Sequence, residues 1–271
     1  MSEIKAKKSL GQNFLKDENV VKKIVEAINP NEGDLLIEIG PGTGALSQVL
    51  PQKGISYKAI EIDPRAVKIL DKMFKQNNFD SFEIIHADFL KINLDEIINS
   101  QEIKGDVKIF GNLPYYITSQ IIFKILESDI DYDSCVFMTQ REVARRISAS
   151  HGNKDFGVLT VACALKSNAE LLFDVSPESF DPVPKVWSSI VRLTKRGDMT
   201  FEMFKSIMRI TKMAFGQRRK MISNSLKSQI NLLDDTPRNN NKIQKYLNKR
   251  PEQLSVEELI NLSDILNNTE K

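Results

Sequence analysis

A glycine-rich turn that directly follows a short apolar run constrains the fold of this chain more than any other feature. The apolar run, residues 35–39, predicts a buried strand, and the turn after it contains Gly40, Gly42 and Gly44. Glycine lets the backbone turn sharply and come close to a ligand where a helix begins. We therefore expect a nucleotide-type ligand at the end of this strand, and a helix over residues 43–52.

Strands and helices alternate through the first two thirds of the chain. Helical patterns over residues 64–76, 118–127 and 140–149 lie between strand-like apolar runs, and Thr118 or Ser119 is expected to cap the second of these helices. Further strands are expected at residues 57–62, 82–86, 107–110, 134–139, 169–175 and 189–194. This alternation predicts an α/β fold with a Rossmann-like, doubly wound and mostly parallel sheet.

The pattern becomes purely helical after Gly197. Apolar residues at helical spacing begin at Phe201, and further helices are expected at residues 218–229, 242–248 and 255–267. We therefore divide the chain into an α/β domain, residues 1–196, and a smaller all-helical C-terminal domain, residues 197–271.

Charge is distributed unevenly along the 271 residues. The net charge is only +2, but residues 185–250 contain 16 Lys and Arg against 4 Asp and Glu, a local charge of +12. Residues 251–271 carry −4, so residues 1–184 carry −6. A basic rear half favours a polyanionic partner such as nucleic acid, and a basic surface that only aids solubility is the alternative.

Neither a membrane segment nor a metal site is expected. The apolar runs are far shorter than a membrane span and the N-terminus has no apolar signal region, so we expect a cytoplasmic protein. Cys135 and Cys163 stand far apart in apolar runs and are expected to be buried. They form no metal-binding pair, and His86 and His151 form no ligand cluster.

Acidic side chains stand at the ends of the predicted strands, where parallel sheets bind ligands. Glu61 can accept hydrogen bonds from both hydroxyls of a ribose, and Asp88 can accept one from an adenine amine. Glu38, just before the glycines, can help to anchor an amino-acid end. The glycine spacing alone also fits a nicotinamide dinucleotide. Glu38 and Asp88 favour a single adenosine with an amino-acid tail, S-adenosylmethionine, over a pyrophosphate bridge.

The segment Gly-Asn-Leu-Pro-Tyr-Tyr, residues 111–116, follows the fourth predicted strand and reaches the same edge of the sheet. The exocyclic amine of adenine is a poor nucleophile because its lone pair is delocalised into the ring. The side-chain oxygen of Asn112 and the carbonyl of Leu113 can hold its N–H groups and favour a tetrahedral nitrogen, while Pro114 stiffens the loop. Tyr115 can stack on the base. Positioning then supplies most of the catalysis, and no strong general base is required.

A target base must leave its stack to reach this loop. Tyr116 and Phe180 can lie around the base, although spacing alone favours a packed loop aromatic for Phe180. Arg218, Arg219 and Lys220 are expected to begin a helix and to contact phosphates. A solvated helix face is the alternative for this cluster, and its basic surroundings disfavour it.

Together these motifs resemble the ribosomal RNA adenine dimethyltransferase family, the KsgA type. The resemblance spans nearly the whole chain and rests on residues 8–15, 38–44, 112–116, 180–186 and 214–220. It implies a Rossmann-like methyltransferase domain followed by a small helical domain that contributes to RNA binding. It also implies S-adenosylmethionine-dependent dimethylation of two adjacent adenosines near the 3′ end of 16S ribosomal RNA. The expected substrate is an immature small ribosomal subunit, and the expected state is a monomer.

The resemblance also assigns roles by position. Cofactor binding falls to Asn13, Leu15, Gly40, Gly42, Glu61, Asp88 and Asn112. The target amine would be held by Asn112, Leu113, Pro114 and Tyr115, with Tyr116 and Phe180 around the base. Trp187 departs from the family pattern, in which a polar residue, commonly Asp, is expected. A Trp there can pack against the neighbouring strand or add a stacking surface.

Three other functions stay open. An Erm-type enzyme would perform the same reaction on large-subunit (23S) RNA, but residues 111–116 and 217–220 look more like the small-subunit enzyme. A non-catalytic ribosome assembly factor would bind without turnover. A nicotinamide oxidoreductase would bind NAD and transfer no methyl group.

Overall fold

The computed structural model describes residues 4–77, 81–197, 199–233 and 237–267. The chain divides into two compact units. The first comprises Met1–Ala144 and Asn168–Lys195, and the second Arg145–Ser167 and Arg196–Lys271.

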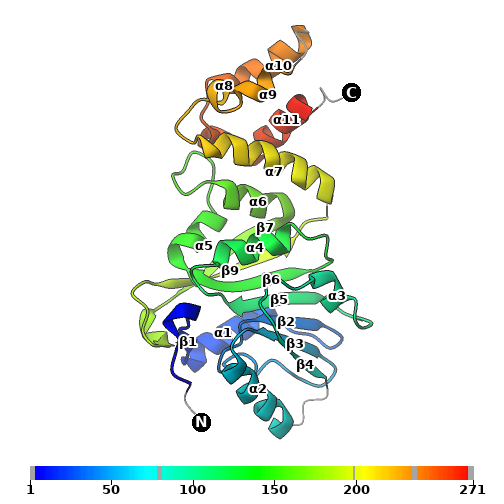
Figure 1. Cartoon of the computed structure of the whole chain (residues 1–271), viewed down its shortest axis with the longest axis vertical. Coiled ribbons are helices and arrows are strands. Elements are labelled where there is room, and N and C mark those ends of the chain that lie inside the picture. Colours follow the sequence, from blue (N-terminus) through cyan, green and yellow to red (C-terminus); the bar gives the residue numbers. More distant parts are fainter. Residues whose placement is uncertain (1–3, 78–80, 198, 234–236, 268–271) are drawn as a thin grey trace. The chain divides into compact units, whose positions relative to one another are not determined.

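A sheet of seven strands, counted over the described residues, forms the centre of the first unit (Figure 1). Its five parallel strands lie in the order β4, β3, β2, β5 and β6, and β9 pairs antiparallel with β6. The strands in this order are β4 (Phe82–His86), β3 (Ser56–Glu61), β2 (Leu35–Ile39), β5 (Val107–Asn112), β6 (Ser134–Gln140), β9 (Ser188–Lys195) and β7 (Ser167–Val175). The predicted α/β fold with a mostly parallel, doubly wound sheet is confirmed.

The direction of winding reverses between β2 and β5. The chain runs outward from β2 to β3 and β4, then returns to place β5 on the other side of β2. Glu38 of β2 lies opposite Phe110 of β5, so the glycine turn after β2 and the loop after β5 leave the sheet side by side. Open α/β sheets bind ligands at such a switch point.

Helices α1 (Glu18–Ile28) and α2 (Pro64–Asn77) bury their apolar sides in one core with side chains of β2, β3 and β6. Asp17 caps α1, because its Oδ1 accepts hydrogen bonds from the amides of Asn19 and Val20. The other helices of this part of the chain are α3 (Leu94–Ile98), α4 (Thr118–Leu126) and α5 (Arg141–Ile147). Shorter elements are β1 (Phe14–Leu15), β8 (Phe180–Asp181) and the 3₁₀ turns η1 (Lys8–Leu10) and η2 (Pro177–Ser179).

The helix predicted over residues 43–52 is wrong, because residues 42–49 form consecutive turns. Gly44 has a φ of 87°, outside the right-handed helical region. The amides of Val49 and Leu50 both donate to the carbonyl of Leu46, so no regular i→i−4 ladder develops. The positive φ of Gly44 therefore prevents the helix, and a Cβ there would also lie 3.0 Å from the side chain of Met73 on α2.

The capping prediction for α4 is also wrong. Ile117 occupies the cap position and makes no side-chain cap bond. The hydroxyl of Thr118 donates instead to the carbonyl of Pro114, at 3.0 Å. The hydroxyl thus stabilises the preceding loop rather than the helix end.

The second unit is helical and is built around α7 (Phe201–Gly216), which packs against α6 (Val158–Lys166), α8 (Ile222–Ser225) and α11 (Val256–Asn267). It also contains α9 (Lys227–Ile230), α10 (Pro237–Leu247) and η3 (Pro251–Gln253). The predicted boundary at residue 197 lies next to the observed one at Arg196, but residues 145–167 join this unit rather than the α/β unit. The reason is α6, whose almost entirely apolar surface packs along α7.

A single helix over residues 218–229 is likewise not observed, since α8 and α9 are two short helices. Arg218 and Arg219 lie in the turn after α7, so the basic cluster does not begin a helix. Gln217, the C-cap of α7, has a φ of −123° and ends the helical run.

Gly111 provides a test of the switch point. A Cβ at this position would lie 2.3 Å from the carbonyl oxygen of Ile39, a backbone atom that cannot rotate away. We expect Gly111→Ala to force β5 away from β2 and to lower the free energy of unfolding by about 3 kcal/mol, at the upper end of overpacking costs. Urea unfolding followed by circular dichroism measures the change.

The control is Gly197→Ala, because a Cβ at Gly197 would meet no atom within 4 Å. Equal stabilities of the two variants would contradict the steric argument.

Candidate active site

A cavity of about 260 Å³ opens at the carboxyl ends of β2, β3, β4 and β5. The glycine turn, the ends of the strands, the loop after β5 and the N-terminal segment all contribute to it. Its lining comprises residues 10–15, 38–43, 45–46, 60–62, 87–90, 112–117 and 121. Every residue predicted to bind the cofactor or to hold the target amine therefore lines this cavity.

The glycine turn leaves room for a ligand. Gly40 has a φ of 66°, and a Cβ built on it would meet no protein atom within 4 Å. A Cβ on Gly42 would instead lie 3.0 Å from the ring of Phe14, so the N-terminal segment lies directly against the turn. The turn is thus a cradle open on the side of Gly40 and closed by Phe14 at Gly42.

Glu61 ends β3 and is fixed by two backbone amides. Its Oε2 accepts from Gly42 N at 2.9 Å, and its Oε1 accepts from Asp63 N at 2.8 Å. Burial raises the pKa of Glu61, and these backbone hydrogen bonds oppose the shift. Each carboxylate oxygen has a second lone pair, so Glu61 can still accept hydrogen bonds from the hydroxyl groups of a ligand in the cavity.

Asp88 follows β4 and is oriented in a similar way. Its Oδ1 accepts from the amide of Leu90 at 3.0 Å, and the ammonium of Lys91 lies 3.8 Å from its Oδ2. Phe89 is buried beside it and also lines the cavity. An apolar ring next to a carboxylate suits a flat heterocycle with an amino group.

Asn112 is the last residue of β5 and joins two segments of the site. Its Nδ2 donates to the carbonyl of Asn13 at 2.9 Å, which leaves its Oδ1 as an acceptor. The amide of Leu113 donates to the carbonyl of Met138 on β6 at 3.0 Å. The carbonyl of Pro114 accepts from Thr118, so the loop is held at three successive residues.

The two tyrosines of this loop differ in their surroundings. Tyr115 is half-buried, its hydroxyl is 2.6 Å from the Oγ of Ser188, and burial raises its pKa. Tyr116 is 60% exposed, and its ring packs near Gly11, whose Cβ would lie 3.0 Å from it. Tyr115 is therefore positioned by the sheet, and Tyr116 lies at the mouth of the cavity.

Phe180 does not lie where a wall around the base would need it. Its side chain is fully buried in the core, and β8 pairs with β1 so that Phe180 lies opposite Leu15. It is not part of the lining of the cavity. The alternative reading, a packed loop aromatic, describes its position in the structure.

A family model described as ribosomal RNA adenine dimethylase matches residues 3–268 of the chain. The chain belongs to this family. The ribosomal RNA small subunit methyltransferase A of Lactobacillus acidophilus is 38% identical over 267 residues, which cover 96% of this chain and 91% of the relative. The protein of the same name from Clostridium botulinum is 38% identical over 269 residues, or 97% and 95% of the two chains.

Solved structures agree in fold. A dimethyladenosine transferase from Plasmodium falciparum matches with a TM-score of 0.80 at 23% identity, covering 94% of this chain and 98% of that one. The 23S rRNA methyltransferase ErmE matches with a TM-score of 0.68 at 25% identity, covering 94% and 100%. Membership of the dimethylase family confirms the predicted resemblance and S-adenosylmethionine as the cofactor, and it removes the nicotinamide alternative.

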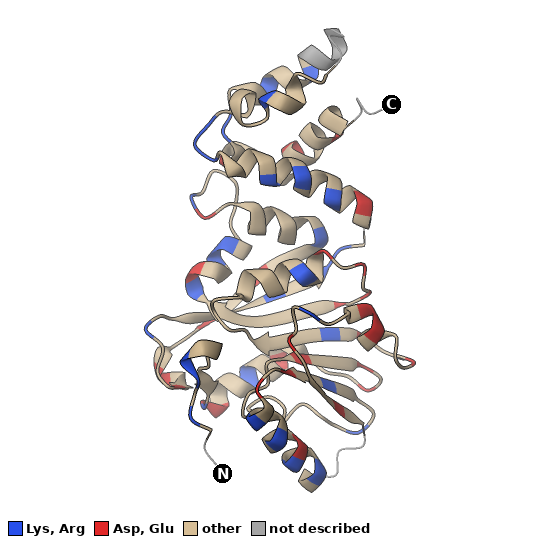
Figure 2. Ribbon diagram, in the orientation of Figure 1, with Lys and Arg blue, Asp and Glu red and all other residues tan. Residues whose placement is uncertain are grey.

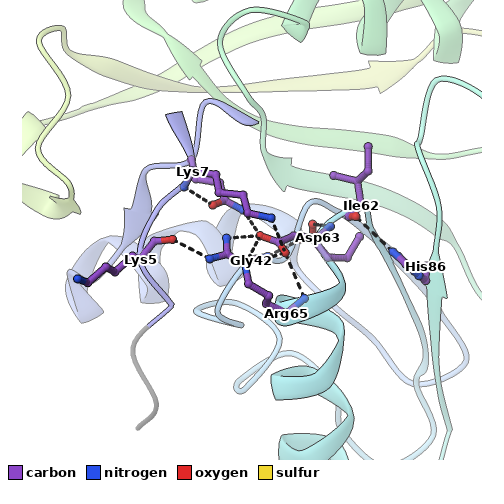
Figure 3. Close-up of polar contacts among 9 residues, drawn as sticks. Lys5, Lys7, Gly42, Ile62, Asp63, Arg65 and His86 are labelled. Carbon is purple, nitrogen blue, oxygen red and sulfur yellow. Dashed lines mark hydrogen bonds and ion pairs between the residues drawn. The ribbon is translucent and has the colours of Figure 1, made fainter. Parts of the chain in front are cut away.

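Asp63 organises the N-terminal segment of this adenine dimethylase in a way that sequence reasoning missed (Figure 3). Arg65 binds its carboxylate at 2.6 Å, Gln12 donates to it at 3.0 Å, and Lys7 lies 3.8 Å away. Arg65 also donates to the carbonyl of Lys5 at 3.1 Å. The hydrogen bonds from Arg65 hold the pKa of Asp63 well below its usual range. The signal in the sequence was the acid two positions after Glu61, followed by Pro and Arg.

The helical unit carries the predicted RNA-binding cluster. Lys and Arg lie along α7 and in the turn after it (Figure 2). Arg218 bonds to Glu252 and to the carbonyl of Lys154, both at 2.5 Å, so it is engaged within its own unit. Arg219 and Lys220 are exposed and extend the basic surface.

Within the described residues, no helix is long and apolar enough to cross a membrane. The same part of the chain contains no group of three or more His, Cys, Asp or Glu arranged to hold a metal ion.

Glu38 lies beneath the cradle with an unusual charge state. It is buried, and its Oε2 accepts hydrogen bonds from the hydroxyls of Ser47 and Tyr57. Burial raises the pKa of Glu38 to about 7, although both hydroxyls oppose the shift. The carboxyl group therefore changes its charge close to neutral pH.

This shift predicts how stability depends on pH. A carboxyl whose pKa is raised in the folded state stabilises the protein at low pH, and this contribution is lost as the pH rises from the unfolded value, near 4.5, to about 7. Glu38→Gln keeps an acceptor for Ser47 and Tyr57 but does not titrate. We expect wild type to lose about 3 kcal/mol relative to this variant across that window, and no more above it.

Urea unfolding of both proteins between pH 5 and pH 8 provides the measurement. A stability difference that stays constant over this range would show that Glu38 is ionised throughout.

Proposed function

We propose that this chain transfers methyl groups from S-adenosylmethionine to the N6 amines of two adjacent adenosines near the 3′ end of small-subunit ribosomal RNA. The observation that carries the proposal is the arrangement of Asn112. Its amide nitrogen is committed to Asn13, and its oxygen remains an acceptor at the cavity. Membership of the adenine dimethylase family gives that acceptor its substrate.

The residues of the cavity fit the cofactor. The open space at Gly40 admits a ligand against the backbone, where a side chain would fill it. Glu61 would bind the ribose hydroxyls, and Asp88 would accept from the adenine amine. Asn13 and Leu15, on the segment packed against the glycine turn, would cover the ligand. When bound, S-adenosylmethionine supplies an electrophilic methyl group on a sulfonium.

The loop after β5 acts on the target amine by positioning it. Asn112 Oδ1 and the carbonyl of Leu113 would accept its two N–H groups, which directs the nitrogen lone pair out of the plane of the ring. Pro114 has no N–H to compete for these acceptors. Tyr115 would stack on the base, and its raised pKa keeps its hydroxyl protonated. The site thus provides orientation and neutral acceptors rather than a base.

The finer partner assignments belong to the same proposal. The substrate is the immature small subunit, which a monomer of this chain binds in the cytoplasm without a metal ion. Arg219 and Lys220 contact its phosphates, while Arg218 supports the turn from which they project. A 23S-type substrate is the second candidate, because the fold also matches that of ErmE. A non-catalytic assembly factor is the third.

A methyl-transfer assay tests the proposal. Labelled S-adenosylmethionine is supplied with small subunits from a strain that lacks the modification, and in parallel with large subunits and with naked RNA. Dimethyladenosine at adjacent positions of small-subunit RNA is the expected product. Label in large-subunit RNA alone would favour the ErmE-like function, and subunit binding without label would favour the assembly factor.

Asn112→Ala is expected to reduce kcat for methylation by about 100-fold or more, in the range found when one oriented polar group is lost from a reaction centre. The RNA surface is untouched, so affinity for small subunits should not change. Steady-state kinetics and a filter-binding assay give the two quantities. The control is Asn19→Ala, at an exposed position on α1. Wild-type turnover by Asn112→Ala would remove this residue from the mechanism.

Replacement of Arg219 and Lys220 by Gln is expected to weaken subunit binding and to reduce the slope of log K against log salt by about one for each lost phosphate contact. Filter binding over a range of salt concentrations measures the slope. Lys72→Gln, at an exposed position on α2, serves as the control. An unchanged slope in the double variant would exclude the cluster from the interface.

A further inference from the structure

Trp187 stands immediately before β9 and is 43% exposed. The residue that follows it, Ser188, is buried, and its hydroxyl lies 2.6 Å from the hydroxyl of Tyr115. Since Tyr115 belongs to the loop that holds the target base in the proposed function, Trp187 is one residue away from a direct contact of that loop.

The strand register places Trp187 at the ligand-binding edge of the sheet. Ser188 lies opposite Gln140, the last residue of β6, and β9 runs antiparallel to β6. Asn112 lies opposite Met138 on the other side of β6. Trp187 therefore emerges where the parallel strands end, and only β6 separates its strand from the strand of Asn112.

Arg141 accompanies the exposed ring. Its guanidinium lies over Trp187, 5.5 Å from the ring centroid, and its amide donates to the carbonyl of Trp187 at 2.9 Å. Asp174 lies 3.7 Å from the guanidinium and orients it, while also accepting a hydrogen bond from Ser189. Both the cation and the aromatic ring are thus held in place by the ends of β6, β7 and β9.

We propose that Trp187 and Arg141 form a subsite for the nucleotide next to the target adenosine in the substrate RNA. The indole stacks on the neighbouring base, and Arg141 contacts its phosphate. This subsite rests on the proposed function, because an enzyme that takes one base out of its stack leaves the next base without a stacking partner. An aromatic ring offers a replacement that tolerates any base, and a cation beside it matches the RNA backbone.

The connection to Tyr115 favours RNA over other occupants of this surface. Tyr115 and Trp187 are linked through Ser188, so a strand whose target base stacks on Tyr115 must pass beside Trp187.

Kinetics with unmethylated small subunits test the subsite. We expect Trp187→Ala to raise the KM for subunits about tenfold, the effect of losing one stacked base. Values of kcat and of the KM for S-adenosylmethionine should stay those of wild type. Trp187→Phe should restore most of the affinity, since a phenyl ring still stacks. Leu171→Ala, at a residue of β7 that is 40% exposed, is the control for loss of surface area.

Fluorescence gives a direct readout, because Trp187 is the only tryptophan of the chain. Deproteinised small-subunit RNA contains no tryptophan and is added until all of the protein is shifted in a gel. Stacking on a base quenches the indole, so emission should fall as RNA binds. Unchanged emission from fully bound protein would overturn the proposal, even if Trp187→Ala raised the KM, because the ring would then contact a ribosomal protein.

The experiments distinguish a failure of the proposed function from a failure of the Trp187 subsite. If wild type leaves small subunits unlabelled, the proposed function is wrong. If wild type labels them and Trp187→Ala has the wild-type KM, only the subsite is wrong. Failure of Trp187→Phe to rescue the KM would also overturn it, since a stacking surface requires an aromatic ring rather than this particular side chain.

Discussion

The close approach of β5 to β2 at Gly111 is the constraint on which the rest of the site depends. A side chain there would collide with the carbonyl of Ile39, so only glycine lets the two strands remain parallel neighbours at their ends. This contact lies at the switch point, where the chain reverses its winding. It brings the cradle at Gly40 next to Asn112. The groups assigned to the cofactor and to the target amine in the proposed function would therefore lie side by side, because β2 and β5 are paired strands.

Residues 10–15 of the N-terminal segment form a further wall of the cavity, beside the glycine turn and the loop after β5. Phe14 packs against Gly42, and the carbonyl of Asn13 accepts a hydrogen bond from the side chain of Asn112. The carboxylate of Asp63 binds Arg65 and also accepts a hydrogen bond from Gln12 of this segment. The contacts of Phe14 with Gly42 and of Asn13 with Asn112 join residues that are far apart in the sequence. In the proposed function, the hydrogen bond from Asn112 to Asn13 links the part of the site that would bind the cofactor to the part that would hold the amine. Loss of order in either part is thereby transmitted to the other.

Local patterns predicted most strands and the edge at which the site lies, because apolar runs and the residues after them are local signals. They failed where tertiary contacts decide. Gly44 packs against Leu70 and Met73 with a positive φ, which prevents the helix predicted over residues 43–52. Helix α6 belongs to the helical unit because its partner is α7. Phe180 illustrates the same limit in the site. An aromatic residue in a proline-rich loop looks like a stacking surface, but its pairing beside Leu15 buries it. Asp63 was missed because Arg65 is its only neighbour in sequence among these partners, whereas Gln12 and Lys7 reach it from the N-terminal segment.

The choice of Asn rather than Asp at residue 112 follows from the two bonds that the side chain must make. Its nitrogen donates to the carbonyl of Asn13, and a carboxylate has no proton to offer there. Two oxygens facing each other would repel, and the N-terminal segment would move away from the loop. In the proposed function the oxygen of Asn112 accepts from the target amine, and a neutral acceptor suffices because that step needs an oriented lone pair rather than a strong base. A carboxylate could accept from the amine but could not donate to Asn13, so only an amide combines the two contacts.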